Sequence, residues 1–325
     1  MKIKSIGLSK TGPAELMHLQ EVELDAPRRN EVIVRNHAVG INFIDIYFRS
    51  GLYPLDLPSG LGMEAAGIVE AVGPEVSRVK LGDRVVYVKG PLGAYAEAHK
   101  LPESSMIILP DAIDFKLAAA MMLKGLTAAY LLLRTFPLQP EHTLLVHAAA
   151  GGTGSILTQW AKDIGARVIG TVGREEKVGL ARRQGCDEVL LYRQVDVAKA
   201  VRKLTDQKGV DVVYDSVGKD TFMSSLDSLK RRGTMVSFGN ASGAVEDFRP
   251  LMLSQKGSLY LTRPTLADYI VDPDEQQALA DALFDQVLNR GLVVNINHEF
   301  PLAKAVEAHK TLESGLTTGS IILTV

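Results

Sequence analysis

The stretch HTLLVHAAAGGTGSILTQWAKDIG, residues 142–165, is the strongest indication of fold in this sequence. An apolar run typical of a buried strand turns through AAGGTG (149–154) into an amphipathic helix. In such a unit Gly151 lets the backbone approach a pyrophosphate, Gly154 lets the helix pack closely on its strand, and the helix N-terminus offers N–H groups to the phosphates. The stretch predicts a dinucleotide-binding turn, although Ala149 stands where the first glycine of the fingerprint belongs. A tight turn without a ligand is the alternative.

The alternation of strands and helices continues towards the C-terminus. We expect strands at ARVIGTVG (166–173), DEVLLY (187–192), VDVVYDSVG (210–218), TMVSFG (234–239) and GSLYLT (257–262), and helices at REEKVGLARRQG (174–185), VAKAVRKLTDQ (197–207) and DTFMSSLDSLKRRG (220–233). Strands that alternate with helices of about 10–15 residues are βαβ units, which build a parallel sheet covered on both faces. The middle of the chain is therefore expected to be a doubly wound α/β domain of the Rossmann class, followed by one more amphipathic helix at 273–291.

The first third of the sequence consists of short strands between frequent turns. EVIVRNHAVGIN (31–42), AAGIVEAVG (65–73) and GDRVVYVKG (82–90) are rich in Val and Ile and contain glycines at their ends or turns. This spacing predicts a small β-rich barrel or sandwich, followed by a long Ala/Leu-rich helix over 114–136. The strand at the very C-terminus differs in character from the parallel set, and we expect it to rejoin the first domain.

The composition is that of an ordinary globular protein. Of the 325 residues, 46% are hydrophobic, and 36 Lys and Arg against 38 Asp and Glu give a net charge of −2. No basic surface for nucleic acid or an anionic membrane is indicated. The single cysteine, Cys186, excludes an intramolecular disulfide. The N-terminus lacks the apolar segment of a signal peptide, and we see no apolar run of about 18 residues that would indicate a spanning helix. We expect two domains in a cytoplasmic protein, with no nucleic-acid or membrane partner.

The end of the second parallel strand bears on the choice between NAD and NADP. An NAD site usually has an acid there, about 20 residues after the glycine turn, to bind the ribose 2′-hydroxyl. This sequence has Val172 and Gly173 instead, followed by Arg174 and Lys177. Cations without a carboxylate favour a 2′-phosphate, to which Tyr192 could donate a hydrogen bond. NADP is favoured, although two glutamates between the cations leave open that both are merely solvated charges.

Five motifs together give the sequence a recognisable pattern: NFIDIYFRSGLYP (42–54), LPSGLGMEAAGIVEAVG (57–73), GDRVVY (82–87), HAAAGGTG (147–154) and YDSVG (214–218). In these motifs, and over essentially the whole chain, the sequence resembles the zeta-crystallin-like quinone oxidoreductases of the medium-chain dehydrogenase/reductase superfamily. The resemblance implies a GroES-like β-rich catalytic domain at 1–123 and 299–325, with an NADP-binding Rossmann domain at 124–298 inserted into it. It also implies NADPH as the cofactor and a homodimer joined through the last Rossmann strands.

The resemblance raises the question of a metal, because zinc members of the superfamily hold their catalytic ion through Cys and His. Here Met63 replaces the His beside Glu64, and Asn42 stands near the place of the Cys. Zinc in enzymes prefers thiolate, imidazole and carboxylate ligands. We expect no metal, and we expect Glu64 to be a structural residue paired with a base. Without a Lewis acid, hydride transfer favours an acceptor that needs little activation, such as a quinone, whose reduced anion water can protonate.

The candidate catalytic residues are Asn42, Tyr47 and Tyr53. Asn42 is expected to hydrogen-bond the cofactor or the acceptor oxygen, and the tyrosines to stack on a planar ring or donate a proton, with simple packing as the alternative for each. Asp45 is expected to orient backbone beside the cofactor. The resemblance implies further cofactor contacts at Tyr130, Gly151, Gly152, Thr153, Gly173, Arg174, Lys177, Tyr192, Ser216, Phe238, Gly239, Ser242, Arg263 and Thr265. Relatives often have a basic residue where this chain has Gly315, so the grip on the 2′-phosphate is expected to be weaker.

Two other functions stay open on the sequence alone. One is an NADPH-dependent reductase of enone or alkenal double bonds on the same fold, which differs from a quinone reductase in pocket shape. The other is a non-catalytic NADPH-binding protein, although no basic patch with interleaved aromatic residues supports RNA binding.

Overall fold

Contacts within the computed structural model, which describes residues 1–325, divide the chain into two units. The β-rich unit comprises Met1–Leu126, Ile270–Leu288 and Val294–Val325. The Rossmann unit comprises Thr127–Tyr269 and Asn289–Val293.

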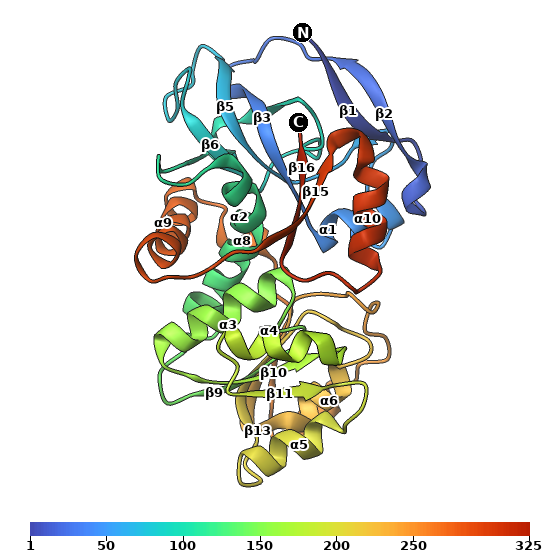
Figure 1. Ribbon diagram of the computed structural model, residues 1–325, viewed down its shortest axis with the longest axis vertical. Helices are drawn as coiled ribbons and strands as arrows, with labels where there is room; N and C mark the ends of the chain where they lie inside the picture. Colours follow the sequence, from blue (N-terminus) through green and yellow to red (C-terminus); the bar gives the residue numbers. More distant parts are fainter. The chain divides into compact units, whose positions relative to one another are not determined.

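The Rossmann unit is built on a six-stranded parallel sheet with the order β11-β10-β9-β12-β13-β14. The strands are β9 (Thr143–Val146), β10 (Arg167–Val172), β11 (Glu188–Leu191), β12 (Val210–Asp215), β13 (Leu229–Ser237) and β14 (Tyr260–Thr262). The helices are α3 (Gly152–Ile164), α4 (Val178–Arg183), α5 (Val197–Leu204), α6 (Phe222–Ser228), α7 (Leu251–Gln255) and α8 (Leu266–Tyr269). Helices α3 and α4 lie on one face of the sheet, and α5 and α6 lie on the other (Figure 1). The predicted doubly wound sheet is confirmed.

One predicted element boundary is wrong. The helix expected over 220–233 ends at Ser228, and residues 229–233 open strand β13. Leu229 pairs with Val210 of β12, and a bulge before Val212 absorbs the irregular residues that follow. The strand is therefore longer than the predicted TMVSFG, and it has a neighbour on each side, so that only β14 is an edge at this end of the sheet.

The β-rich unit contains a seven-stranded sheet and a three-stranded sheet. The larger runs β15-β16-β3-β5-β6-β8 with β7 paired to β3, and the smaller runs β2-β1-β4. The strands are β1 (Lys2–Leu8), β2 (Met17–Glu23), β3 (Glu31–Ile41), β4 (Ser59–Gly60), β5 (Glu64–Val72), β6 (Arg84–Tyr87), β7 (Ala98–Pro102), β8 (Ile107–Ile108), β15 (Ile296–Pro301) and β16 (Ser320–Thr324). Because β16 pairs antiparallel with β3, the C-terminal strand rejoins the first part of the chain, as expected.

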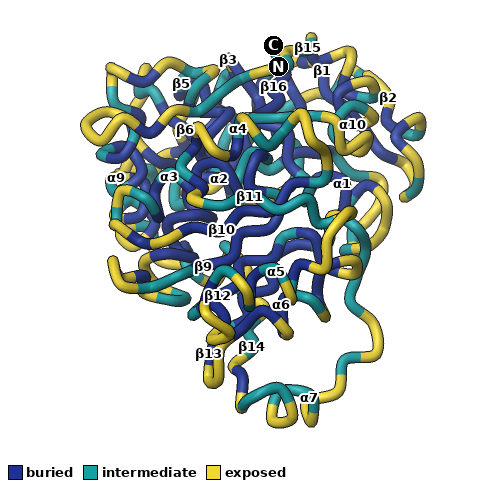
Figure 2. Tube along the Cα trace, turned by 60° about the horizontal axis from the view of Figure 1, so that its bottom comes forward, coloured by how far each residue is buried: buried dark blue, intermediate teal, exposed yellow.

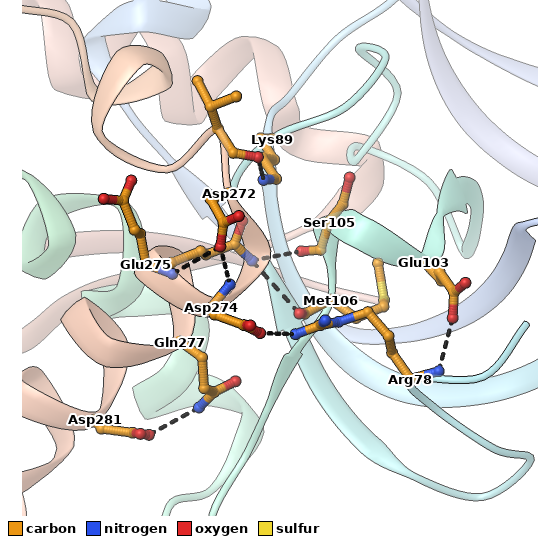
Figure 3. Close-up of polar contacts among 12 residues, drawn as sticks. Arg78, Lys89, Glu103, Ser105, Met106, Asp272, Asp274, Glu275, Gln277 and Asp281 are labelled. Atoms are coloured by element: carbon orange, nitrogen blue, oxygen red, sulfur yellow. Dashed lines mark hydrogen bonds and ion pairs between the residues drawn. The ribbon is translucent and has the colours of Figure 1, made fainter.

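Four helices accompany these sheets: α1 (Phe43–Ser50), α2 (Phe115–Tyr130), α9 (Pro273–Asn289) and α10 (Ala305–Glu313). Most of α9 groups with the β-rich unit, whereas the boundaries expected from the resemblance count its residues with the Rossmann domain. Its polar contacts explain this grouping. Arg78 Nη2 lies 2.9 Å from Asp274 Oδ1, and Gln276 Nε2 donates to the carbonyl oxygens of Ser105 and Met106 (Figure 3).

Helix α2 continues as one turn of π-helix over Leu131–Thr135. By length and hydropathy the combined segment Phe115–Thr135 would suffice to cross a membrane, although Lys116, Lys124 and Arg134 interrupt its apolar run. The most apolar 18-residue window of this segment is 72% buried inside the structure, as in the core helix of a soluble protein. Strands β9, β10 and β12 of the parallel sheet are mostly buried, whereas α7 is largely exposed (Figure 2).

Candidate functional site

The glycine turn between β9 and α3 has the geometry that its sequence predicts. Ala148 adopts a positive φ of 52°, and the Gly151 N–H donates to its carbonyl oxygen at 2.9 Å. A Cβ on Gly154 would overlap that same carbonyl oxygen, so α3 can approach the turn only with glycine there. The first turn of α3 leaves the N–H groups of Gly152 and Thr153 without intrahelical acceptors. This corner can therefore bind an anion through backbone donors.

The strand β10 ends in Val172 without a carboxylate, and cationic and hydroxyl groups lie around its end, with Glu175 and Glu176 between the two cations. A Cβ on Gly173 would lie 3.1 Å from the Tyr192 ring, so the phenol borders the space that glycine leaves open. Arg174 and Lys177 follow in the first turns after the strand, where burial, and then the charge of Arg174, lowers the pKa of Lys177. Arg193 was not expected here. Its Nε donates to Tyr192 Oη at 3.1 Å and its guanidinium lies 5.5 Å from the ring centroid, and its adjacency to Tyr192 in sequence was the available signal.

The loops after β12 and β13 lie at the same edge of the sheet. Asp215 is fully buried and accepts from the N–H groups of Val217 and Gly218 at 2.8 and 3.0 Å. A Cβ on Gly239 would overlap the carbonyl oxygen of Ser216, so the two loops touch through backbone. Ser242 Oγ donates to the Val217 carbonyl oxygen at 2.8 Å. Four of the expected cofactor residues, Ser216, Phe238, Gly239 and Ser242, thus belong to one loop cluster at the carboxyl ends of parallel strands, where ligands of such sheets bind.

A buried polar chain supports this cluster. Asp215 also accepts from the hydroxyl groups of Thr221 and Ser225, and His147 Nε2 lies 2.9 Å from Ser225 Oγ while its Nδ1 lies 2.9 Å from Thr171 Oγ1. Burial lowers the pKa of His147, which favours the neutral ring. Neither His147 nor Asp215 was predicted as a site residue. They are linked through the Ser225 hydroxyl, and Asp215 holds the loop after β12 through its bonds to Val217 and Gly218.

The remaining expected residues of this unit have specific partners. Tyr130 stacks on Tyr269 with ring centroids 4.3 Å apart and an interplanar angle of 17°. Arg263 Nη1 donates to the Ser237 carbonyl oxygen at 3.0 Å, at the end of β13. Thr265 lies two residues further on, before α8, where its carbonyl accepts from the Asp268 N–H.

In the β-rich unit, α1 and the loop after it bring three aromatic side chains together. The rings of Tyr47 and Tyr53 lie 5.2 Å apart, and the rings of Phe48 and Tyr53 lie 5.7 Å apart nearly edge to face. The Tyr53 N–H donates to the Tyr47 carbonyl oxygen at 3.0 Å, which closes the loop on the helix. Tyr47 is buried and Tyr53 half-buried, so both candidate tyrosines also have the packing role that was their alternative.

Asn42 and Asp45 lie at the N-terminus of α1 and are both buried. The Asn42 N–H donates to Asp45 Oδ2 at 2.8 Å, and Asn42 Nδ2 donates to Glu64 Oε2 at 2.7 Å. Asp45 Oδ2 also accepts from Tyr95 Oη at 2.9 Å. Burial raises the pKa of Asp45 to about 7, against the effect of these two hydrogen bonds. The expected backbone-orienting contact of Asp45 is present at Asn42.

The donor set around Asn42 does not fit a zinc ion. Asn42 offers an amide whose nitrogen already donates to Glu64, and Met63 offers a thioether. Nowhere in the chain do three or more His, Cys, Asp or Glu side chains form a group that could hold a metal. The expected basic partner of Glu64 is present, because Lys124 Nζ lies 3.9 Å from its Oε2.

The chain is similar to known proteins along nearly its whole length. Residues 28–111 match the alcohol dehydrogenase GroES-like domain, and residues 152–280 match the zinc-binding dehydrogenase family. A quinone oxidoreductase of Pseudomonas aeruginosa is 52% identical over 98% of this chain and 99% of that protein, and a 2-haloacrylate reductase of a Burkholderia species is 42% identical over 97% of each. The crystal structure of Escherichia coli quinone oxidoreductase complexed with NADPH has a TM-score of 0.97 at 48% identity, over 99% of this chain and 100% of that one. The chain therefore belongs to the quinone oxidoreductase family of the medium-chain dehydrogenase/reductase superfamily.

Proposed function

We propose that this protein is an NADPH:quinone oxidoreductase that transfers a hydride directly to its acceptor without a metal. The observation that supports this most is the end of β10, where Gly173, Tyr192 and Lys177 combine open space, a hydroxyl and a cation, and where no carboxylate stands on the last residue of the strand. The full-length quinone oxidoreductase relatives, one of them crystallised with NADPH, support the same function.

The residues of the Rossmann unit fit NADPH in two places. Gly151 lets the backbone approach the pyrophosphate, and the N–H groups of Gly152 and Thr153 bind it at the N-terminus of α3. Lys177 and Tyr192 bind the 2′-phosphate beside Gly173, with Arg174 as a second cation. The loop residues Ser216, Phe238, Gly239 and Ser242, with Tyr130, Arg263 and Thr265, complete the expected contacts. When bound, NADPH supplies the hydride.

The β-rich unit supplies the residues for the acceptor. Tyr47 and Tyr53 present aromatic surface to a planar quinone, and Asn42 hydrogen-bonds the acceptor oxygen or the nicotinamide. A quinone accepts a hydride without Lewis-acid activation, because its aromatic anion is stabilised by delocalisation and is protonated by water. The protein then needs only to orient the reactants, which these residues do without a general acid.

The test is steady-state oxidation of NADPH with 1,4-benzoquinone, 9,10-phenanthrenequinone and an alkenal, each corrected for the uncatalysed reaction. We expect both quinones to be reduced with a kcat/KM at least about tenfold above that for the alkenal. The relative named for 2-haloacrylate reduction favours an activated double bond as the second candidate acceptor. A higher kcat/KM for the alkenal would select that function, and no turnover with any acceptor would select a non-catalytic NADPH-binding protein.

We also propose a cytoplasmic homodimer without nucleic-acid or membrane partners. Strand β14 is the edge of the parallel sheet, and its Tyr260 is 62% exposed. An apolar edge strand exposed in this way is a template for pairing, so a second copy of the chain across a two-fold axis would cover it. The near-neutral net charge gives no electrostatic reason for a polyanionic partner.

A further inference from the structure

Glu64 and Lys124 form a buried pair beside Asn42. The Glu64 side chain is fully buried and that of Lys124 is 9% exposed, with Lys124 Nζ 3.9 Å from Glu64 Oε2. Burying a carboxylate and an ammonium together costs several kcal/mol of desolvation for each ion, and replacing such a pair by apolar residues often leaves stability unchanged or raises it. Fold stability alone is therefore a weak reason for this pair.

Both oxygens of Glu64 accept hydrogen bonds from fixed donors. Oε1 accepts from the Leu123 N–H at 2.6 Å, and Oε2 accepts from Asn42 Nδ2 at 2.7 Å. The Leu123 donor is backbone within helix α2, so the carboxylate cannot turn without losing it. An acceptor fixed in this way decides which end of the Asn42 amide faces it, since only the nitrogen can donate.

Lys124 fixes the backbone on the other side of Asn42. Its Nζ donates to the carbonyl oxygen of Ile41 at 3.2 Å, one residue before Asn42. The pair therefore holds both the main chain that leads into Asn42 and the Asn42 side chain itself.

The strand next to the pair leaves room for it. A Cβ on Gly40 would overlap Glu64 Oε2 and the Ala119 carbonyl oxygen, so the carboxylate occupies space that only glycine leaves free. Gly40 of β3 lies directly opposite Glu64 of β5 in the antiparallel pairing of the two strands. Strand β3 and helix α2 thus leave the Glu64 carboxylate only one position between them.

We propose that Glu64, held by Lys124, is a positioning residue that fixes the Asn42 amide, with one amide N–H on Glu64 and the other held in one direction for the acceptor oxygen. The proposal rests on the quinone reductase function proposed above. It assigns Glu64 a role in the reaction that does not involve a metal. A carboxylate acceptor also polarises the amide, which strengthens its remaining hydrogen bonds.

The test is a double-mutant cycle at saturating NADPH and quinone. Glu64→Gln combined with Lys124→Met replaces the pair by neutral side chains of similar volume, so that the variant keeps its fold. We expect its kcat to fall about tenfold or more, because the Asn42 amide is no longer held in one orientation. In an Asn42→Ala background the same pair of substitutions should lower kcat by less than about twofold, since the residue through which the pair acts is absent.

The control is Asp211→Asn. Asp211 is mostly buried at the amino end of β12, paired with Lys230 and bonded to the Thr143 N–H, and it lies at the opposite end of its strand from Ser216. It should lower the unfolding temperature and leave kcat within about twofold, which shows that loss of a partly buried ion pair does not by itself lower activity.

A crystal structure of the Glu64→Gln/Lys124→Met variant without ligand gives a readout apart from activity, with Asn42 expected in more than one rotamer. Additive losses of kcat in the cycle, or a kcat within about twofold of wild type in the neutral-pair variant, would overturn the proposal. Absence of quinone reduction in the wild-type protein would instead overturn the proposed function, so the two failures are distinguishable.

Discussion

At the residue scale, β10 ends in Val172, followed by Gly173, where NAD-binding Rossmann domains have an acid. The glycine leaves space beside the Tyr192 ring, and Arg193 donates to the hydroxyl of that tyrosine. These contacts keep the phenol next to the space and surround it with positive charge. In the proposed function they serve as partners of the 2′-phosphate within one short segment of chain.

Lys177→Ala tests the assignment of the phosphate site. A charge-assisted hydrogen bond is worth roughly 1.5–3 kcal/mol, which corresponds to about ten- to a hundredfold in affinity. We expect wild type to bind NADPH that much more tightly than NADH, and Lys177→Ala to lose most of the preference with NADH binding almost unchanged. Dissociation constants from isothermal titration calorimetry measure this, with the exposed Lys203→Ala of α5 as the control. Equal affinities of wild type for the two cofactors would contradict the assignment, and a preference that survives in Lys177→Ala would move the phosphate site to Arg174 and Tyr192.

Asp45→Asn tests the buried carboxyl at the start of α1. Burial raises the pKa of Asp45 to about 7, so the folded protein holds a proton that the unfolded chain releases near pH 4. Asp45 therefore lowers the free energy of unfolding as the pH rises from about 4 to about 7, by at most about 1.4 kcal/mol for each pH unit. Asparagine cannot ionise, so the unfolding temperature of Asp45→Asn relative to wild type should increase steadily from pH 5 to pH 7.

Asp187→Asn is the matched control for that experiment. Partial burial acts to raise the pKa of Asp187, but hydrogen bonds from Lys162 and the Val168 N–H outweigh it and the pKa is lowered. Its stabilising charge is therefore complete throughout this pH range, and the difference between Asp187→Asn and wild type should be constant. Parallel pH profiles for both aspartate variants would refute the role given to Asp45.

Some site residues could be predicted from sequence and others could not, for a physical reason. Gly151 and Gly173 are recognisable because their function depends on neighbours in the same strand–turn–helix unit. The role of Glu64 depends on Lys124, sixty residues away, and that of His147, in the turn after β9, depends on Ser225 of helix α6. A single sequence contains no signal for such pairs, although it did indicate that Glu64 needed a base.

At the element scale, the contact between α3 and the turn before it decides whether the phosphate corner can form. Gly154→Ala places a methyl group against the Ala148 carbonyl oxygen, so α3 must shift away from the turn. We expect NADPH affinity to fall about tenfold or more and the unfolding temperature to fall by several degrees. Fluorescence titration and calorimetry measure the two effects.

Gly179→Ala in α4 is the matched control for that substitution. Its Cβ would meet only the end of the Arg183 side chain, at 3.4 Å, and alanine favours a helix over glycine by about 0.5–1 kcal/mol. This variant should be as stable as wild type or more stable, and it should bind NADPH normally. If the two glycine variants behave alike, the close approach of α3 to the turn is not what the site requires.

Element boundaries were predictable only where local sequence decides them. The strand-and-helix alternation of residues 142–262 follows from periodicity, and it is confirmed. The predicted boundary between α6 and β13 was wrong, because Lys230, Arg231 and Arg232 are as compatible with an exposed helix end as with an exposed strand. Leu229 pairs with Val210 in the folded protein, and this tertiary contact stabilises the strand rather than the helix.

At the scale of the whole molecule, both ends of the chain build one sheet. Strand β16 pairs with β3, and β15 pairs with β16, so the Rossmann unit is an insertion between parts of the β-rich unit. The different character of the C-terminal strand was sufficient to predict this. The grouping of α9 with the β-rich unit could not be predicted. It depends on contacts between this helix and loops far away in the sequence, such as those of Asp274 with Arg78 and of Gln276 with Ser105.

Tyr260→Lys tests the homodimer. A lysine on an edge strand opposes pairing with another chain through its charge and solvation. We expect wild type to sediment as a dimer of 35.2 kDa chains at micromolar concentration, and Tyr260→Lys to dissociate at least about tenfold more readily. Leu81→Lys, at another exposed apolar residue, should remain dimeric. A stable wild-type monomer in analytical ultracentrifugation would contradict the proposed assembly.

The most direct test of metal-free quinone reduction is stopped-flow oxidation of NADPH by 1,4-benzoquinone with protein whose zinc content has been determined on the same sample. Because Asn42 and Met63 offer no zinc-binding pair, we predict that the active protein contains no stoichiometric zinc. We also predict that it oxidises one NADPH for each quinone far faster than the reaction without enzyme, that chelators leave the rate unchanged, and that ethanol is not oxidised. One zinc per chain together with activity that chelators remove, or ethanol oxidation comparable to quinone reduction, would contradict the account.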